Sequence, residues 1–300
     1  MALFRSKRIY RKFLPLWMMV TLVCACSGCA IARRAAANAG LNTMRSLVVA
    51  IESQPDPELV RQGLPAFILL IDGMLVSYPQ NTDLLLAATN AYNSYCQAFL
   101  TNEDEAERAS KLYARAKDYG LRLLRQRQFF NAVIEGSIDD YEAALRLFTV
   151  SDVPHVHAAA AAWLGWIVAN SDSMAALAQL PRALALSRRV LELDDTYGNG
   201  AAHLVVAIYN AVQPRGAGQD LDKSRRHFAK AIELAGPANL TPRVLHAEII
   251  GKATLDQVFF TETLEAVLAV DIAKYPETRL FNELAQDRAQ SLLNQSDEIF

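Results

Sequence analysis

Apolar residues recur at helical spacing along most of the chain, and this pattern predicts a protein built from α-helices. Over 102–125 an apolar stripe lies opposite charged residues, because residues three and four apart share one face of a helix. Over 220–235 a second stripe follows Asp220, a residue suited to cap a helix, and it ends at Gly236 and Pro237. Strand-like alternation is hard to find elsewhere, so we predict an all-α fold.

Further helices are expected wherever the same spacing lies between turn-forming residues. The expected ranges are 57–77, 82–100, 139–148, 155–170, 174–194, 198–212, 241–254, 257–273 and 277–296. Asn102, followed three residues later by Glu105, resembles a capping box at the start of the 102–125 helix. Pro181 lies either in a first helical turn or at a division between two helices, and the sequence leaves both open.

Short corners of Pro, Gly, Asn and Asp recur between these predicted helices. Corners over 194–199, 236–239 and 274–277 lie about forty residues apart, a little more than the tetratricopeptide period of about 34. Within two of the units, the segment 188–193 parallels 229–234. We therefore predict a tetratricopeptide-like helical-hairpin solenoid with degenerate repeats, and a non-repeating helical bundle is the alternative.

The N-terminus has the pattern of a secretory signal. Several basic residues and no acid precede an apolar stretch of roughly a dozen residues, which is short for a membrane-spanning helix. Ser27, Gly28 and Cys29 at the end of this stretch resemble a bacterial lipobox, in which the cysteine is acylated and becomes the first residue. We expect lipidation at Cys29. Cleavage before Cys26, a retained N-terminal anchor and plain secretion are the alternatives.

Removal of the signal divides the sequence into a signal peptide over 1–28, a linker or helix over 29–56 and a helical domain over 57–300. The net charge of −2 becomes about −7, because five basic residues and no acid leave with the signal. An acidic chain lacks the basic surface that binds nucleic acid or anionic lipid, so membrane attachment would depend on the N-terminal lipid. Beyond the signal we expect no second membrane-spanning stretch.

Residues that could carry chemistry are scattered over separate predicted elements. The histidines fall in different helices or on different helix faces, which disfavours a metal site; they are His155, His157, His203, His227 and His246. The glycines at 216 and 218 lack the strand and the Lys-Ser/Thr of a phosphate loop. Cys96 is left without a disulfide partner and is expected in the core. We expect no enzymatic activity, no cofactor and no metal.

Two groups of aromatic residues are candidates for a ligand-binding surface. Trp163 and Trp166 lie three residues apart after five successive alanines, so they either pack in the core or wall an apolar pocket. His203 and Tyr209 lie on the predicted 198–212 helix, and the second helices of a solenoid can line a binding surface. We expect these four residues to lie near a shared apolar cavity or channel, with ordinary core packing as the alternative.

The order and spacing of several segments resemble the TatT family, periplasmic lipoproteins associated with tripartite ATP-independent periplasmic (TRAP) transporters. The resemblance covers most of the chain after the signal and is most specific over 158–166, 191–209, 214–220, 228–234, 239–245 and 281–289. The sequence departs from the family where Ala217 separates two glycines that are expected to be adjacent. It departs again over 248–250, where Glu-Ile-Ile stands in place of expected aromatic residues.

The resemblance implies an all-helical, tetratricopeptide-like protein that can form a homo-oligomer. It also implies a TRAP transporter substrate-binding protein as partner and an apolar or organic-acid ligand. We therefore expect a scaffold in the periplasm that is lipid-anchored to the outer membrane, since Ala30 rather than Asp follows Cys29. The alternative is a general tetratricopeptide lipoprotein adaptor in cell-envelope assembly, without a ligand of its own.

Overall fold

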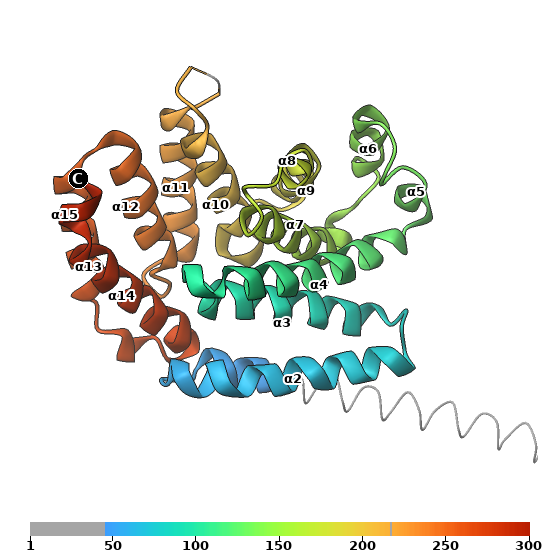
Figure 1. Cartoon of the computed structure of the whole chain (residues 1–300), viewed down its shortest axis with the longest axis horizontal. Helices are drawn as coiled ribbons and strands as arrows, with labels where there is room; N and C mark the ends of the chain where they lie inside the picture. The colour runs from blue at the N-terminus through green and yellow to red at the C-terminus, as the bar shows by residue number, and fades with distance from the viewer. Residues whose placement is uncertain (1–45, 217) are drawn as a thin grey trace, which may run out of the picture. The chain divides into compact units, whose positions relative to one another are not determined.

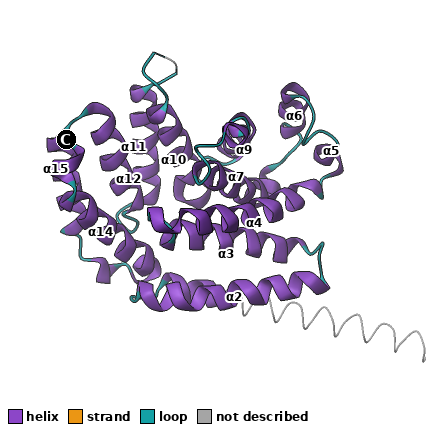
Figure 2. Cartoon of the chain, viewed as in Figure 1, coloured by secondary structure: helices purple, strands orange, loops and turns teal. Residues whose placement is uncertain are grey.

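The computed structural model describes residues 46–216 and 218–300, and every regular element within these ranges is a helix (Figure 1, Figure 2). The predicted all-α fold is therefore confirmed. The chain divides into two compact units, 1–51 and 52–300. In the first unit, the described residues 46–51 are helical. The expected signal peptide and the lipidation site Cys29 lie outside the described residues.

The second unit consists of long helices joined by short helical turns. The long helices are α2 (Pro57–Ser77), α3 (Thr82–Phe99), α4 (Ala106–Arg125), α6 (Ile138–Leu145), α7 (Val153–Val168), α9 (Leu180–Leu193), α10 (Tyr197–Val212), α11 (Leu221–Ala235), α12 (Thr241–Thr254), α13 (Gln257–Leu268) and α14 (Arg279–Asn294). The short ones are α5 (Gln128–Asn131), α8 (Met174–Leu177) and α15 (Ser296–Ile299), with 3-10 turns over Glu103–Glu105, Val150–Asp152, Ile272–Lys274 and Pro276–Thr278. Every range expected from the sequence contains a helix.

The ends of α11 follow the sequence prediction. The Asp220 side chain accepts a hydrogen bond from the backbone N–H of Lys223, which satisfies a donor in the first turn. Gly236 ends the helix with φ 63°, a left-handed conformation that costs glycine little. Pro181 lies in the first turn of α9, where the missing N–H breaks no helical hydrogen bond.

The predicted capping box at Asn102 and Glu105 is wrong. The Asn102 side chain makes no capping hydrogen bond, and its backbone carbonyl accepts from the N–H of Glu105 to form a 3-10 turn before α4. The Glu105 carboxylate instead accepts a hydrogen bond from Arg61 of α2 at 2.9 Å. A tertiary ion pair has therefore replaced the local cap.

Consecutive helices pack against one another throughout the second unit. Contacts run from α2 to α3, α3 to α4, α4 to α7, α7 to α9 and onward to α14, with further contacts between helices two steps apart such as α10 and α12. The last long helix, α14, also contacts α2 (Figure 1). Such stacking is typical of helical solenoids. The assignment of tetratricopeptide-like repeats stays a prediction.

Small residues let α4 and α7 cross at close range. A Cβ atom added to Gly120 of α4 would lie 2.8 Å from the Cα of Ala159 on α7. A Cβ atom added to Gly165 of α7 would lie 2.2 Å from the ring of Tyr113 on α4. The small side chains of the alanine run over 158–162 therefore let α4 approach α7 closely. The crossing brings side chains of α4 beside Trp163 and Trp166.

Both sides of α2 are apolar. One side packs into the core, whereas Leu59, Leu69, Leu70 and Val76 are exposed on the other. By length and composition α2 could cross a membrane, a test that core helices of soluble proteins also pass. By that measure of length and composition, the expectation that no such stretch follows the signal is wrong, since α2 is 21 residues long and carries only three charged residues, Glu58, Arg61 and Asp72.

Candidate functional site

Trp163 and Trp166 lie beside a lysine of the crossing helix. The Nζ atom of Lys117 on α4 is 3.5 Å from the centroid of the Trp166 ring and 5.4 Å from that of Trp163. The negative face of an indole ring attracts an ammonium group, so both rings stabilise the lysine side chain. The tryptophans therefore form part of a polar group as well as part of the core.

Gln179, the residue before α9, completes this group. Its Oε1 accepts hydrogen bonds from Lys117 Nζ at 2.6 Å and from Trp163 Nε1 at 2.9 Å. Two donors saturate an amide oxygen. Its Nε2 donates to the carbonyl of Ala175 at 3.1 Å, which fixes the amide. We call Lys117, Trp163, Trp166 and Gln179 the lysine–tryptophan cluster.

Lys117 is a half-buried cation without a carboxylate partner in the described part of the chain. The lysines that form ion pairs there are Lys111, Lys230, Lys252 and Lys274. Burial lowers the pKa of Lys117 to about 8, because desolvation penalises the ammonium form. The amine therefore loses its proton at a lower pH than an unperturbed lysine side chain, whose pKa is about 10.4.

The tryptophans divide between core packing and the cluster. Trp163 is only 4% exposed and packs among buried residues that include Ile167 and Leu186. Trp166 is half-buried at the edge of the same core. Core packing therefore holds for Trp163, while its Nε1 and the ring of Trp166 remain available to the cluster.

His203 on α10 forms a different pair. Its Nδ1 lies 2.8 Å from Nδ1 of His227 on α11, so one ring donates a hydrogen bond and the other accepts it. Tetrahedral metal ligands at about 2.1 Å from zinc would stand more than 3 Å apart, so this distance marks a hydrogen bond. Asp195 Oδ2 is 3.8 Å from His203 Nε2. Burial lowers the pKa of both histidines, which favours their neutral forms.

The backbone before His203 departs from a regular helix. Gly198, Asn199 and Gly200 take left-handed conformations with φ of 60°, 55° and 80°. Gly200 is held near α11, since a Cβ there would lie 2.9 Å from the side chain of Leu234. These three residues bend the predicted 198–212 helix at its start.

Tyr209 is half-buried on α10. Six residues separate it from His203, which corresponds to about 240° around the helix axis, so the two side chains leave α10 in different directions. Side-chain contacts join the tryptophans to Lys117 and Gln179, and His203 to His227. A cavity shared by Trp163, Trp166, His203 and Tyr209 stays a prediction.

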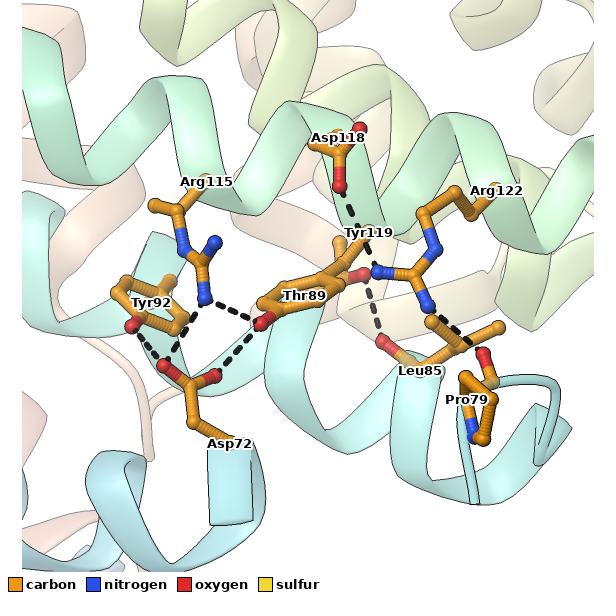
Figure 3. Close-up of polar contacts among 9 residues, drawn as sticks. All are labelled: Asp72, Pro79, Leu85, Thr89, Tyr92, Arg115, Asp118, Tyr119 and Arg122. Atoms are coloured by element: carbon orange, nitrogen blue, oxygen red, sulfur yellow. Dashed lines mark hydrogen bonds and ion pairs between the residues drawn. The ribbon is translucent and has the colours of Figure 1, made fainter. Parts of the chain in front are cut away.

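A third polar group joins α2 to the next two helices (Figure 3). Asp72 of α2 accepts hydrogen bonds from the hydroxyl groups of Tyr92 on α3 and Tyr119 on α4, each at 2.7 Å. Arg115 of α4 donates to Asp72 at 3.2 Å and to the Tyr119 oxygen at 2.7 Å. These groups satisfy one another, so we interpret them as a structural clamp and refer to them as the Asp72 clamp.

Glu248, which stands where the family resemblance suggests an aromatic residue, is buried and paired. Arg288 of α14 donates to Oε2 from Nε at 3.0 Å and from Nη2 at 2.7 Å. Its Nη2 also donates to Oε1 at 3.0 Å. Lys252 donates to Oε1 at 3.1 Å. At this position, an ion pair between α12 and α14 therefore stands where the family resemblance suggests the packing of an aromatic residue.

Comparison with known proteins places these groups within a matched region. The family model of the TRAP transporter T-component matches residues 53–300. A protein of Treponema pallidum (strain Nichols), described as uncharacterized, is 25% identical over 267 residues, which cover 82% of this chain and 81% of that protein. The family resemblance seen in the sequence is therefore confirmed: the chain belongs to the TRAP transporter T-component family.

Proposed function

We propose that the protein is an accessory component of a TRAP transporter that docks the transporter's substrate-binding protein. The family match over 53–300 carries this proposal. The stacked helices support it, because helical stacks offer extended surfaces to protein partners. A transporter component needs no catalytic site of its own, and we expect no enzymatic activity.

Docking is tested by pull-down of the tagged full chain from detergent extracts of its own cells. We expect a TRAP substrate-binding protein to be enriched relative to an unrelated lipoprotein that carries the same tag. Enrichment of cell-wall or barrel-assembly proteins without any transporter subunit would instead favour a general adaptor in cell-envelope assembly. Light scattering on the purified protein tests whether it forms the homo-oligomer that the family resemblance implies.

We further propose a location in the periplasm, with a lipid on Cys29 that anchors the chain to the outer membrane. The Ser27-Gly28-Cys29 sequence after a short apolar stretch supports this anchor, and Ala30 favours the outer membrane. Mass spectrometry of the N-terminal peptide should find an acylated Cys29 as first residue. A peptide that still carries residues 1–28 contradicts the proposal.

The proposed function includes an apolar or organic-acid ligand, bound near Trp163, Trp166, His203 and Tyr209. The half-buried Trp166 ring and the polar tips around it support this, because ligand sites combine apolar walls with a few polar groups. His203→Ala separates the alternatives. Weaker ligand binding at nearly unchanged melting temperature indicates a ligand role, whereas a lower melting temperature alone indicates a core role.

A further inference from the structure

We propose that the lysine–tryptophan cluster binds the carboxylate of an amphiphilic acid, with Lys117 as the group that recognises the anion. The inference rests on the proposed function only in taking the protein to bind a small ligand. The occupant is a compound with one carboxylate and an apolar tail.

The first support is that Lys117 lacks a counter-ion where most other cations of α4 have one. Of the five others, Arg108 donates to the hydroxyl of Tyr95 at 3.1 Å. The remaining four each contact a carboxylate: Lys111, Arg115, Arg122 and Arg125. One turn away from Lys117 on α4, positions 113, 114, 120 and 121 are uncharged. A cation removed from water without a partner is unfavourable, and a bound carboxylate would compensate its charge.

The second support is an unused donor capacity. An ammonium group has three N–H bonds. The oxygen of Gln179 accepts one, and the face of the Trp166 ring takes up a second direction. Gln179 cannot accept more, since Trp163 already donates to the same oxygen. At least one N–H of Lys117 therefore remains for an incoming anion.

The third support is the set of exposed apolar residues on the segment that joins Trp166 to Gln179. Between Trp166 and Gln179 along the chain, Val168, Met174 and Leu177 are exposed. Exposed valine and leucine offer a surface to an alkyl tail, and the flexible methionine side chain adapts to ligands of different shape. This segment therefore offers contacts for the apolar tail of an amphiphilic acid, while Lys117 of α4 offers the contact for its carboxylate.

The test uses hexanoate and hexanol, which share an alkyl chain and differ in charge. The full chain in lipid nanodiscs is titrated with each probe, with empty nanodiscs as blank. Two of the three tryptophans of the sequence, Trp163 and Trp166, lie in the cluster, so tryptophan emission reports on binding. We expect hexanoate to bind at least tenfold more tightly than hexanol, and Trp166→Phe to reduce the change in emission.

Lys117→Met removes the charge and keeps an unbranched side chain. We expect it to weaken hexanoate binding at least tenfold and to leave hexanol binding within twofold. Lys111→Met is the matched control, since Lys111 lies on the same helix, is exposed and pairs with Glu107. Circular dichroism and melting temperature verify that both variants fold.

The pH dependence of the unmodified protein gives a test that needs no variant. Hexanoate affinity should fall up to tenfold per pH unit above about 8, as Lys117 loses its proton, while hexanol affinity stays constant. Neighbouring groups do not produce this profile. Burial raises the pKa of Cys96 and Tyr113 and lowers that of His155 and His157, which moves all four away from about pH 8.

Equal affinity for hexanoate and hexanol, or an unchanged preference in Lys117→Met, overturns the anion site and leaves a ligand of the proposed function possible. If neither hexanoate nor hexanol binds, the anion site is also overturned. In that case the pull-down of the substrate-binding protein decides independently whether the docking function stands.

Discussion

The effect of replacing a glycine depends on the space around it in the folded protein. At Gly165 the ring of Tyr113 occupies the space of a side chain, whereas no atom lies within 4 Å of a Cβ added to Gly73 on α2. The same substitution should therefore have opposite effects at the two sites, because steric overlap dominates at one and helix propensity at the other.

We expect Gly165→Ala to lower the free energy of unfolding by about 2–3 kcal/mol, through displacement of the Tyr113 ring. Gly73→Ala should raise it by about 0.5–1 kcal/mol, since alanine is the better helix former. Urea unfolding followed by circular dichroism measures both. Similar values for the two variants would show that the α4–α7 crossing adapts to the added methyl group.

His246 is expected to make stability depend on pH. Its ring lies 5.0 Å from those of Phe228 and Phe259, and burial lowers its pKa to about 4. Between the unfolded pKa of about 6.5 and this folded value, the unfolded state binds more protons, so the free energy of unfolding falls as pH falls. We expect His246→Phe to remove about 1–2 kcal/mol of that decrease, measured by urea unfolding at pH 7 and pH 4.5. An unchanged pH dependence would place the decrease at other histidines.

At the scale of elements, the Asp72 clamp holds α2 on α3 and α4. We expect Asp72→Ala to lower the free energy of unfolding by about 2–3 kcal/mol, because it leaves two tyrosine hydroxyls and an arginine without their acceptor. Asp118→Ala is the control, since that exposed carboxylate pairs with Arg122 at 3.6 Å and contributes less than about 0.5 kcal/mol.

Thermal melting compares the two variants, and limited proteolysis shows whether α2 detaches first. Equal losses of stability in Asp72→Ala and Asp118→Ala would mean that the half-buried Asp72 clamp contributes no more than a surface ion pair.

The elements themselves were predictable because apolar spacing and turn residues act locally. Asp220 and Gly236 end α11 where their chemistry indicates. Asn102 and Glu105 fail as a cap because Arg61, distant in sequence, offers the Glu105 carboxylate a better partner. The bend at Gly200 depends likewise on contact with Leu234 of the next helix. Local patterns do not contain such contacts.

The lysine–tryptophan cluster was predictable only in part. Trp163 and Trp166 attract attention as an aromatic pair, whereas Lys117 resembles any other charged residue on the surface of α4. One signal was available, since no acidic residue lies one turn from Lys117 on either side. Its position above the rings depends on the crossing angle of α4 and α7, and that angle follows from packing over the whole helix pair.

At the scale of the whole molecule, Cys96 reports on global unfolding. It is 1% exposed, and burial raises the pKa of its thiol to about 12, so the reactive thiolate is scarce. We expect iodoacetamide to modify Cys96 at least a hundredfold more slowly in native buffer than in urea, as measured by peptide mass spectrometry. Rapid modification in native buffer would reveal local opening of α3.

Family membership was predictable at this scale because the order and spacing of many segments carry it together. The match over 53–300 agrees with that resemblance. The ligand was not predictable in the same way, since ligand recognition depends on which side chains meet at one place in the folded protein. The spacing of residues in the sequence did not predict that Lys117 and Gln179 contact the two tryptophans.

The apolar character of α2 also matters before the protein folds. Under the proposed periplasmic location, the chain crosses the inner membrane unfolded, and α2 then meets the bilayer as a 21-residue apolar stretch without its folded partners. A charged residue at the centre of such a stretch opposes its release into the bilayer by about 2.5–3.5 kcal/mol, and a charge nearer one end opposes it less. Asp72, the charge nearest the centre of α2, can thus keep the helix from stopping in the inner membrane, and later joins it to Tyr92 and Tyr119.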